Sequence, residues 1–177
     1  MNRELEEKLA LEFPFMRRGK SYETQKAEGR VSDLYGAWGC ECSNGWYELL
    51  RGLCSDITAV YQKCGQPVDI VVDQVKEKWG TLRFYYHFEG CPHVLHALDF
   101  IGSGSIRFEQ SATDLQREIA TIVRKWEETS GTVCEYCGKP GSLRKDRRVS
   151  TLCDTCWDLR NKRRAETAKG VANKEES

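Results

Sequence analysis

The 177-residue chain contains no apolar run that approaches the roughly 20 residues a membrane-spanning helix needs. Its first segment, Met1 to Leu11, alternates charged side chains with leucine, where a secretory signal peptide would carry a continuous hydrophobic stretch. These two absences predict a cytoplasmic protein without a membrane anchor. Because the cytoplasm keeps thiols reduced, the nine cysteines indicate metal ligands or buried thiols more than disulfides.

Signatures of common catalytic sites are also missing. The sequence has no Walker motif, no Rossmann glycine fingerprint, no serine nucleophile elbow and no pattern of paired carboxylates. Only three histidines are present, and none follows His96. We therefore expect a protein that is not an enzyme, with catalysis around Cys91 and His93 as the third hypothesis after two binding functions.

Charge is divided unevenly along the chain. The total of 27 basic and 27 acidic residues balances, yet residues 131–177 hold 11 Lys and Arg against 7 Asp and Glu. Four thiolates on one divalent metal would add about two negative charges to this part. The basic excess alone therefore does not establish nucleic-acid binding.

Hydrophobic spacing predicts the helices of residues 1–130. A first helix should end before Pro14, a longer one should span Trp46 to Cys64, and a third should run from about residue 111 to Glu128. Residues 17–39 are polar and contain several glycines, so we interpret them as mostly loop. The stretch over 91–110 fits a helical turn or a short strand.

Residues 69–90 have the pattern of an antiparallel hairpin, with β-branched and aromatic residues on both sides of Trp79-Gly80. Strand alternation places cations beside aromatic rings on the face away from the core. Such a face suits phosphates, bases or an acidic protein, although a solvated hairpin carries the same alternation, so both interpretations stay open. The candidate partner-binding residues here are Lys76, Lys78, Trp79, Arg83 and Tyr85.

The cysteines near the C-terminus form two C-x₂-C pairs separated by 15 residues: Cys134 with Cys137, and Cys153 with Cys156. This spacing is typical of a structural zinc site, in which four thiolates complete the tetrahedron. A redox pair or unligated thiols would be the alternative. We predict one structural Zn²⁺, in a zinc ribbon or a treble-clef module of knuckle, hairpin and helix.

The loop between these pairs is basic, and its cations are further candidates for partner contact: Arg144, Lys145, Arg147 and Arg148. A second metal site is the other open question. It would combine thiol and imidazole ligands, although neither spacing is a standard pair: Cys40, Cys42, Cys91, His93 and His96.

Two resemblances follow from these motifs. Residues 134–164 resemble the metal-binding half of His-Asn-His endonucleases, whose treble clefs also run from a C-x₂-C-G knuckle to a Leu-Cys-x₂-Cys helix; the catalytic histidines are absent here. Residues 40–156 are similar to uncharacterised small bacterial and bacteriophage proteins, through the Gln74-Val-Lys-Glu-Lys-Trp-Gly-Thr-Leu-Arg-Phe-Tyr-Tyr86 hairpin and the Cys134-Glu-Tyr-Cys137 finger. The second resemblance implies a phage or prophage origin.

The sequence thus predicts an α+β fold, with helices packed on a small antiparallel sheet over residues 1–130. A structural zinc module follows at 131–164, and a polar, flexible tail at 165–177. The leading functional hypothesis is a non-catalytic, phage-type interaction protein that inhibits a host defence or nuclease protein, in the host cytoplasm. The alternative is a nucleic-acid-binding regulator that uses the basic zinc module.

Overall fold

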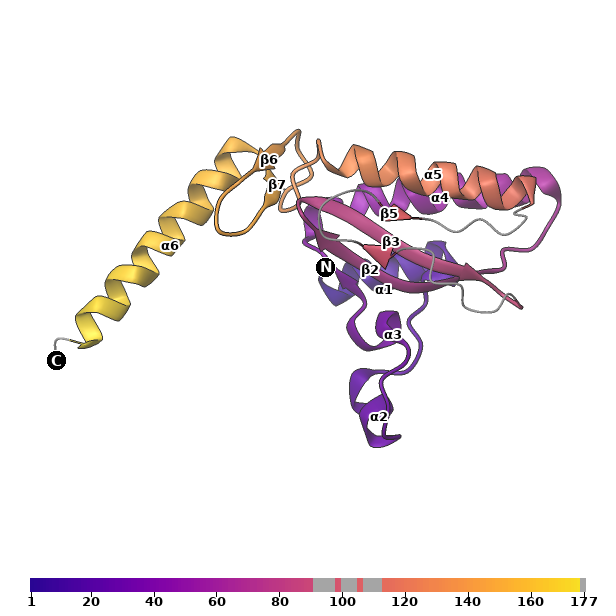
Figure 1. The fold of residues 1–177 in the computed structure, drawn as a ribbon, viewed down its shortest axis with the longest axis horizontal. Coiled ribbons are helices and arrows are strands. Elements are labelled where there is room, and N and C mark those ends of the chain that lie inside the picture. Colours follow the sequence, from indigo (N-terminus) through magenta and orange to yellow (C-terminus); the bar gives the residue numbers. More distant parts are fainter. Residues whose placement is uncertain (91–97, 100–104, 107–112, 176–177) are drawn as a thin grey trace.

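The computed structural model describes the backbone of residues 1–90, 98–99, 105–106 and 113–175 (Figure 1). The helices are α1 (Arg3–Glu12), α2 (Tyr22–Ala27), α3 (Leu34–Trp38), α4 (Tyr47–Cys64), α5 (Asp114–Ser130) and α6 (Asp154–Glu175). The strands are β1 (Cys40–Glu41), β2 (Ile70–Lys78), β3 (Thr81–Phe88), β4 (Leu98–Asp99), β5 (Ser105–Ile106), β6 (Ser142–Arg144) and β7 (Ser150–Leu152). The expected α+β class is confirmed.

A three-stranded sheet in the order β1-β2-β3 lies at the centre of residues 1–130. β2 and β3 are antiparallel and are joined at Trp79-Gly80, as predicted. β1 runs parallel to β2, with Cys40 opposite Val75, so the sheet is mixed where we expected only antiparallel pairing. The difference arises because β1 is only two residues long and carries no alternation that a sequence pattern could reveal.

The core lies between this sheet and two long helices. α4 carries the predicted apolar stripe, in which Leu50, Leu53 and Ile57 are fully buried. α5 begins with a capping box at Thr113 and packs along α4 and β3 (Figure 1). Full burial of each such aliphatic side chain contributes roughly 1.5–3 kcal/mol, so these contacts stabilise the first part of the chain.

The expectation of mostly loop over residues 17–39 holds for only about half of the segment, because the rest forms α2 and α3. Each helix is short but capped by a side chain: Ser21 accepts from the N–H of Thr24, and Asp33 accepts from the N–H of Gly36. Within α2 the Gln25 side chain is buried, and its amide donates to the carbonyls of Lys20, before the helix, and Asp33, after it. The capping residues are visible in the sequence, but the helices that follow them are too short to show a hydrophobic repeat.

Residues 91–110 are described only at β4 and β5, which pair antiparallel with Leu98 opposite Ile106. Of the two conformations that the sequence allowed here, a helical turn or a short strand, the described residues form short strands. The remaining expectations for this stretch lie outside the described residues.

The C-terminal part follows the order knuckle, β6–β7 hairpin, α6, which is the treble-clef order. Cys156 lies in the first turn of α6, as predicted. The helix continues to Glu175 and extends away from the rest of the molecule (Figure 1), so it enters the segment for which composition predicted a flexible tail. The flexibility of residues 165–177 stays a prediction.

Within the described residues, no helix combines the length and the apolar character required to cross a membrane.

Candidate metal centre and adjoining surface

The four cysteines of the two C-x₂-C pairs come together in space, although 15 residues separate the pairs. Their sulfur atoms all lie within 4.8 Å of one another, and Cys137 Sγ is 3.6 Å from Cys153 Sγ. A tetrahedral ion with metal–sulfur bonds of about 2.3 Å would place its sulfurs about 3.8 Å apart. Cys134, Cys137, Cys153 and Cys156 can therefore hold one metal ion.

Local structure brings each pair into position. Gly138, with φ of +76°, turns the chain directly after Cys137, and its N–H donates to the carbonyl of Cys134. The N–H of Cys156 donates to Cys153 Sγ, which lowers the pKa of the Cys153 thiol to about 7. Burial and the neighbouring thiols raise the pKa of Cys156, so without metal Cys153 is the more readily available of the two as the thiolate that binds metal.

The metal-binding module is attached to the first part of the chain by hydrogen bonds at the knuckle. Glu135 is buried, and its Oε1 accepts from both the N–H and the hydroxyl of Ser43, each at 3.0 Å. Gly45 donates its N–H to the carbonyl of Glu135, and Trp46 donates its indole N–H to the carbonyl of Val133. Residues 43–46, which lead into α4, and the knuckle therefore form one hydrogen-bonded unit.

Gly45 is required for this close approach. A Cβ atom at this position would lie 2.5 Å from the backbone of Cys134, Cys137 and Gly138. Real Cβ atoms do not come so close to backbone atoms, so any side chain here would push the knuckle away from α4.

The tip of the β2–β3 hairpin, Lys78–Thr81, contacts the module at a second place. Thr151 donates its hydroxyl to the carbonyl of Gly80 at 2.6 Å, and Arg148 pairs with Glu77 at 2.8 Å. The other carboxylate oxygen of Glu77 accepts the N–H of Gly80. Leu143 of β6 packs so closely on Gly80 that a Cβ there would be 2.4 Å from its side chain.

Trp79 is the most unusual residue of this joined region. It is 66% exposed, and its φ of +56° is the only positive φ of a non-glycine residue in the described part of the chain. Gly80 follows with φ of +80°, so both central residues of the two-residue turn are left-handed, as in a type I′ turn. Asn or Gly is favoured at the first such position, and a bulky side chain there is strained.

The face of the hairpin that points away from the core carries the predicted cations and aromatic rings. Lys76 lies opposite Arg83, and its ammonium lies 5.1 Å from the ring centre of Tyr85. Arg83 donates to Thr81 Oγ1 and to the carbonyl of Leu82. Side chains of the hairpin therefore alternate between the core face and the outer face, as predicted. On the outer face, Lys76 and Arg83 already contact other residues of the hairpin.

The four basic residues of the β6–β7 hairpin divide into two pairs. Arg144 is bonded to Asp154 at the start of α6, and Arg148 is paired with Glu77. Lys145 and Arg147 are exposed, and their side chains have no hydrogen-bond or ion-pair partner among the residues that the structure describes. Whether a partner molecule contacts any of them stays a prediction.

The remaining thiols that the structure describes are not arranged as a second metal site. Cys40 and Cys42 are buried, and burial raises the pKa of the Cys40 thiol to about 12 and that of Cys42 further, which disfavours the thiolate form. Cys40 lies 3.8 Å from the hydroxyl of Tyr35. The other proposed ligands, Cys91, His93 and His96, lie outside the described residues.

Sequence reasoning missed the roles of Glu135 and Arg160. Glu135 lies between two ligand cysteines, and nothing local indicates that its carboxylate binds Ser43, 92 positions earlier. Arg160 is one of several basic residues of α6, yet it is only 8% exposed. The one signal in the sequence was that Arg160 follows Trp157 by three residues. Residues at this spacing are neighbours on a helix, which indicates contact between the guanidinium and the indole.

No protein-family model, no curated protein and no solved structure matches this chain.

Proposed function

We propose that the chain is a non-catalytic, zinc-containing interaction protein that binds a host protein through the hairpin tip and the β6–β7 hairpin. The observation that carries the proposal is Trp79, a large aromatic side chain that is mostly exposed although its backbone conformation favours Asn or Gly. Strained residues of this kind occur frequently at functional sites.

Zinc is the proposed metal because the donor set consists of four thiolates. Soft sulfur ligands in a tetrahedral arrangement suit Zn²⁺ or an iron–sulfur centre, and paired C-x₂-C motifs in a knuckle and a helix are typical of structural zinc. Four protein ligands fill the tetrahedron, so the ion would serve to stabilise the module. It would hold β6–β7 in the position where Thr151 and Arg148 meet the hairpin tip.

The proposed contact region, which we name the joint surface, consists of Trp79, Leu143 and Arg148. Leu143 is 44% exposed and packs on Gly80, the residue that follows Trp79 in the chain. The Arg148 side chain is 62% exposed. Tryptophan and arginine are enriched among the residues that dominate binding energy at protein interfaces. The joint surface combines both types around an aliphatic contact.

The resemblance of the hairpin and the finger to bacteriophage proteins supports a phage or prophage origin. On that basis we propose the host cytoplasm as the location and inhibition of a host defence or nuclease protein as the activity. An inhibitor needs only a surface complementary to its target, which agrees with a chain in which we find no known catalytic motif.

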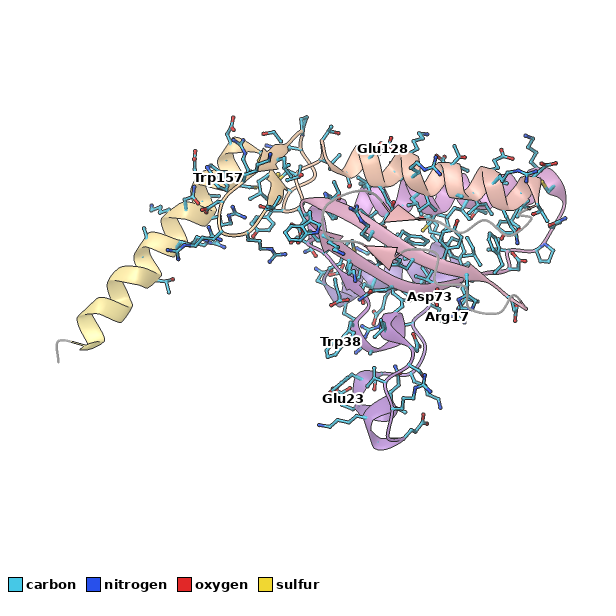
Figure 2. All side chains as sticks on the ribbon, viewed as in Figure 1. Arg17, Glu23, Trp38, Asp73, Glu128 and Trp157 are labelled. Carbon is cyan, nitrogen blue, oxygen red and sulfur yellow. The ribbon has the colours of Figure 1, made fainter. Side chains whose placement is uncertain are left out.

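A comparative pull-down from bacterial lysate tests the proposal. The chain, its Trp79→Ala variant and a Trp38→Ala control would be immobilised in equal amounts. Trp38 is also exposed, at 49%, but it lies on α3, far from the zinc module that Trp157 marks (Figure 2). A protein retained by the native chain and by the Trp38 variant but not by the Trp79 variant would support the joint surface. Equal retention by all three would contradict it.

A nucleic-acid-binding regulator is the second candidate, favoured by the exposed side chains of Lys145 and Arg147, for which the described residues supply no partner. Filter binding at two salt concentrations separates the candidates. Binding to nucleic acid through phosphate contacts falls steeply as salt rises, whereas a specific protein contact need not.

A further inference from the structure

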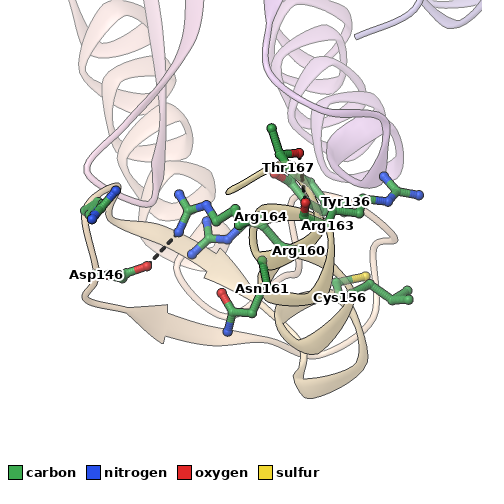
Figure 3. A pocket seen from close by; sticks show the side chains of 11 residues that line it. Tyr136, Asp146, Cys156, Arg160, Asn161, Arg163, Arg164 and Thr167 are labelled. Carbon is green, nitrogen blue, oxygen red and sulfur yellow. Dashed lines mark hydrogen bonds and ion pairs between the residues drawn. The ribbon is translucent and has the colours of Figure 1, made fainter. Parts of the chain in front are cut away.

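A hollow of about 930 Å³ lies between the β6–β7 hairpin and α6 (Figure 3). Its lining is rich in arginine. The charged residues that line it are Asp146, Arg147, Arg160, Arg163 and Arg164.

Arg160 is the residue of this hollow whose hydrogen bonding is incomplete. Its side chain is 92% hidden from solvent, its Nη1 donates to Ser150 Oγ at 2.6 Å, and its guanidinium carbon lies 4.5 Å from the ring centre of Trp157. The other two nitrogens, Nε and Nη2, are buried and have no acceptor within the described residues. These two nitrogens present parallel N–H bonds on one edge of the guanidinium, the edge that binds an oxoanion bidentately.

Leaving this edge without an acceptor is costly. A buried donor without a partner costs roughly 1–3 kcal/mol, and more when it is charged. Arginine cannot reduce this cost by losing its proton, because its pKa is too high. The most economical solution is an anion with two oxygens that accepts both N–H bonds.

We propose that this hollow binds a phosphate group, with Nε and Nη2 of Arg160 donating to two of its oxygens. Phosphate suits the hollow better than a carboxylate because several arginines surround the fork. Arg163 and Arg164 follow Arg160 by three and four residues, so they project from the same side of α6. Arg147, from the loop between β6 and β7, also lines the hollow.

The charges already present do not neutralise this cluster. Asp146 is the one carboxylate among the lining residues described, and it accepts from Arg164 at 2.6 Å. The backbone N–H of Arg147 and the side chain of Arg164 hold the pKa of Asp146 below its ordinary value, so it is ionised at neutral pH. Four arginines thus face one carboxylate. A zinc-bound thiolate at Cys156 would offset part of this charge through space without accepting the N–H bonds of Arg160.

Access to the fork requires a small rearrangement. Nε and Nη2 of Arg160 are shielded from solvent, so an anion reaches them only when a neighbouring side chain shifts. The rim offers such side chains, since arginines have several rotatable bonds and Arg163 has no ion pair within the described residues.

Calorimetric titration of the full, metal-loaded chain with inorganic phosphate in chloride buffer tests the proposal. Arg160→Lys keeps the charge but removes the fork, so we expect phosphate binding to weaken by about tenfold or more. Lys162→Gln is the matched control, because Lys162 lies on the same helix but does not line the hollow. We expect it to change the affinity by less than about twofold.

Arg160→Lys also loses contacts to Ser150 and Trp157, so metal content and a thermal melt must show that the module is folded. If it is not, Arg163→Gln carries the test and should weaken binding severalfold. Absence of phosphate binding by the native chain, or equal loss in Lys162→Gln, would overturn the proposal.

A second titration with a short oligonucleotide identifies the source of the phosphate. Binding that is much tighter than that of inorganic phosphate, competed by phosphate and weakened in Arg160→Lys, would identify the nucleic-acid backbone. Binding of phosphate alone would identify a small phosphorylated molecule. The proposal is independent of the protein-binding function, because Trp79→Ala should leave phosphate binding unchanged.

Discussion

Replacing Trp79 separates stability from binding, because the backbone and the side chain at this position make opposite demands. The left-handed conformation disfavours a bulky side chain, whereas the exposed indole is the proposed contact. We consider two variants, Trp79→Asn and Trp79→Ala. Both remove the indole, so the difference between them reports only the preference of the turn.

The magnitude follows from the turn geometry. Asn tolerates the left-handed region and Asn-Gly is a preferred pair in type I′ turns, whereas Ala at positive φ costs roughly 1 kcal/mol. We therefore expect Trp79→Asn to be more stable than Trp79→Ala by about 0.5–1 kcal/mol. The indole is about one-third buried, and losing that burial costs both variants the same amount, which cancels in the comparison.

Urea denaturation monitored by circular dichroism gives the free energy of unfolding of each variant. The dependence of this free energy on urea concentration is measured separately for each variant. The protein identified by the pull-down would then be titrated with both. Equal stability of the two variants, or a more stable Ala variant, would show that the turn at residue 79 is not left-handed in solution. Retained binding in either variant would remove Trp79 from the interface.

Three further predictions concern the metal site and the core. Cys153→Ser should release the metal and unfold the C-terminal module, since metal binding and folding are coupled in so small a unit; elemental analysis and circular dichroism measure both, and full metal content in the variant would contradict the site. Gly45→Ala should destabilise the chain by about 2–4 kcal/mol, because its Cβ would meet the knuckle backbone 2.5 Å away; an unchanged denaturation midpoint would show that the knuckle does not contact α4. Leu53→Ala should cost about 2–4 kcal/mol while metal content persists, with the exposed Leu11→Ala as the neutral control; equal effects of the two would mean that the α4 register is wrong.

Several features of the site could be read from the sequence because they depend on local spacing. Two cysteines three residues apart approach one ion through a tight turn, and Cys156 falls in the first turn of a helix that the composition favours. The stripe of α4 and the alternation of β3 are likewise set by the repeats of 3.6 and 2 residues. These patterns predicted the metal ligands and the outer face of the hairpin.

Other features depend on contacts between distant residues. The carboxylate of Glu135 binds Ser43, 92 positions away, and Thr151 binds the carbonyl of Gly80, 71 positions away. No local pattern encodes such pairs, because they form only when the complete fold brings the two segments together. The helices within residues 17–39 were missed because α2 is held by one capping side chain and the hydrogen bonds of Gln25, and α3 by one cap and the burial of Tyr35 in the core.

The sequence by itself predicted the four candidate metal ligands, the main helices and the hairpin, since each pattern is made of residues close together in the chain. Only the tertiary structure decided that the metal-binding module packs on the hairpin tip, that Trp79 is exposed in a strained turn, and that Arg160 is buried with one edge unpartnered among the described residues. Burial and exposure are the physical reason: they depend on what surrounds a side chain in space, and the same Trp or Arg can be core or surface according to the fold.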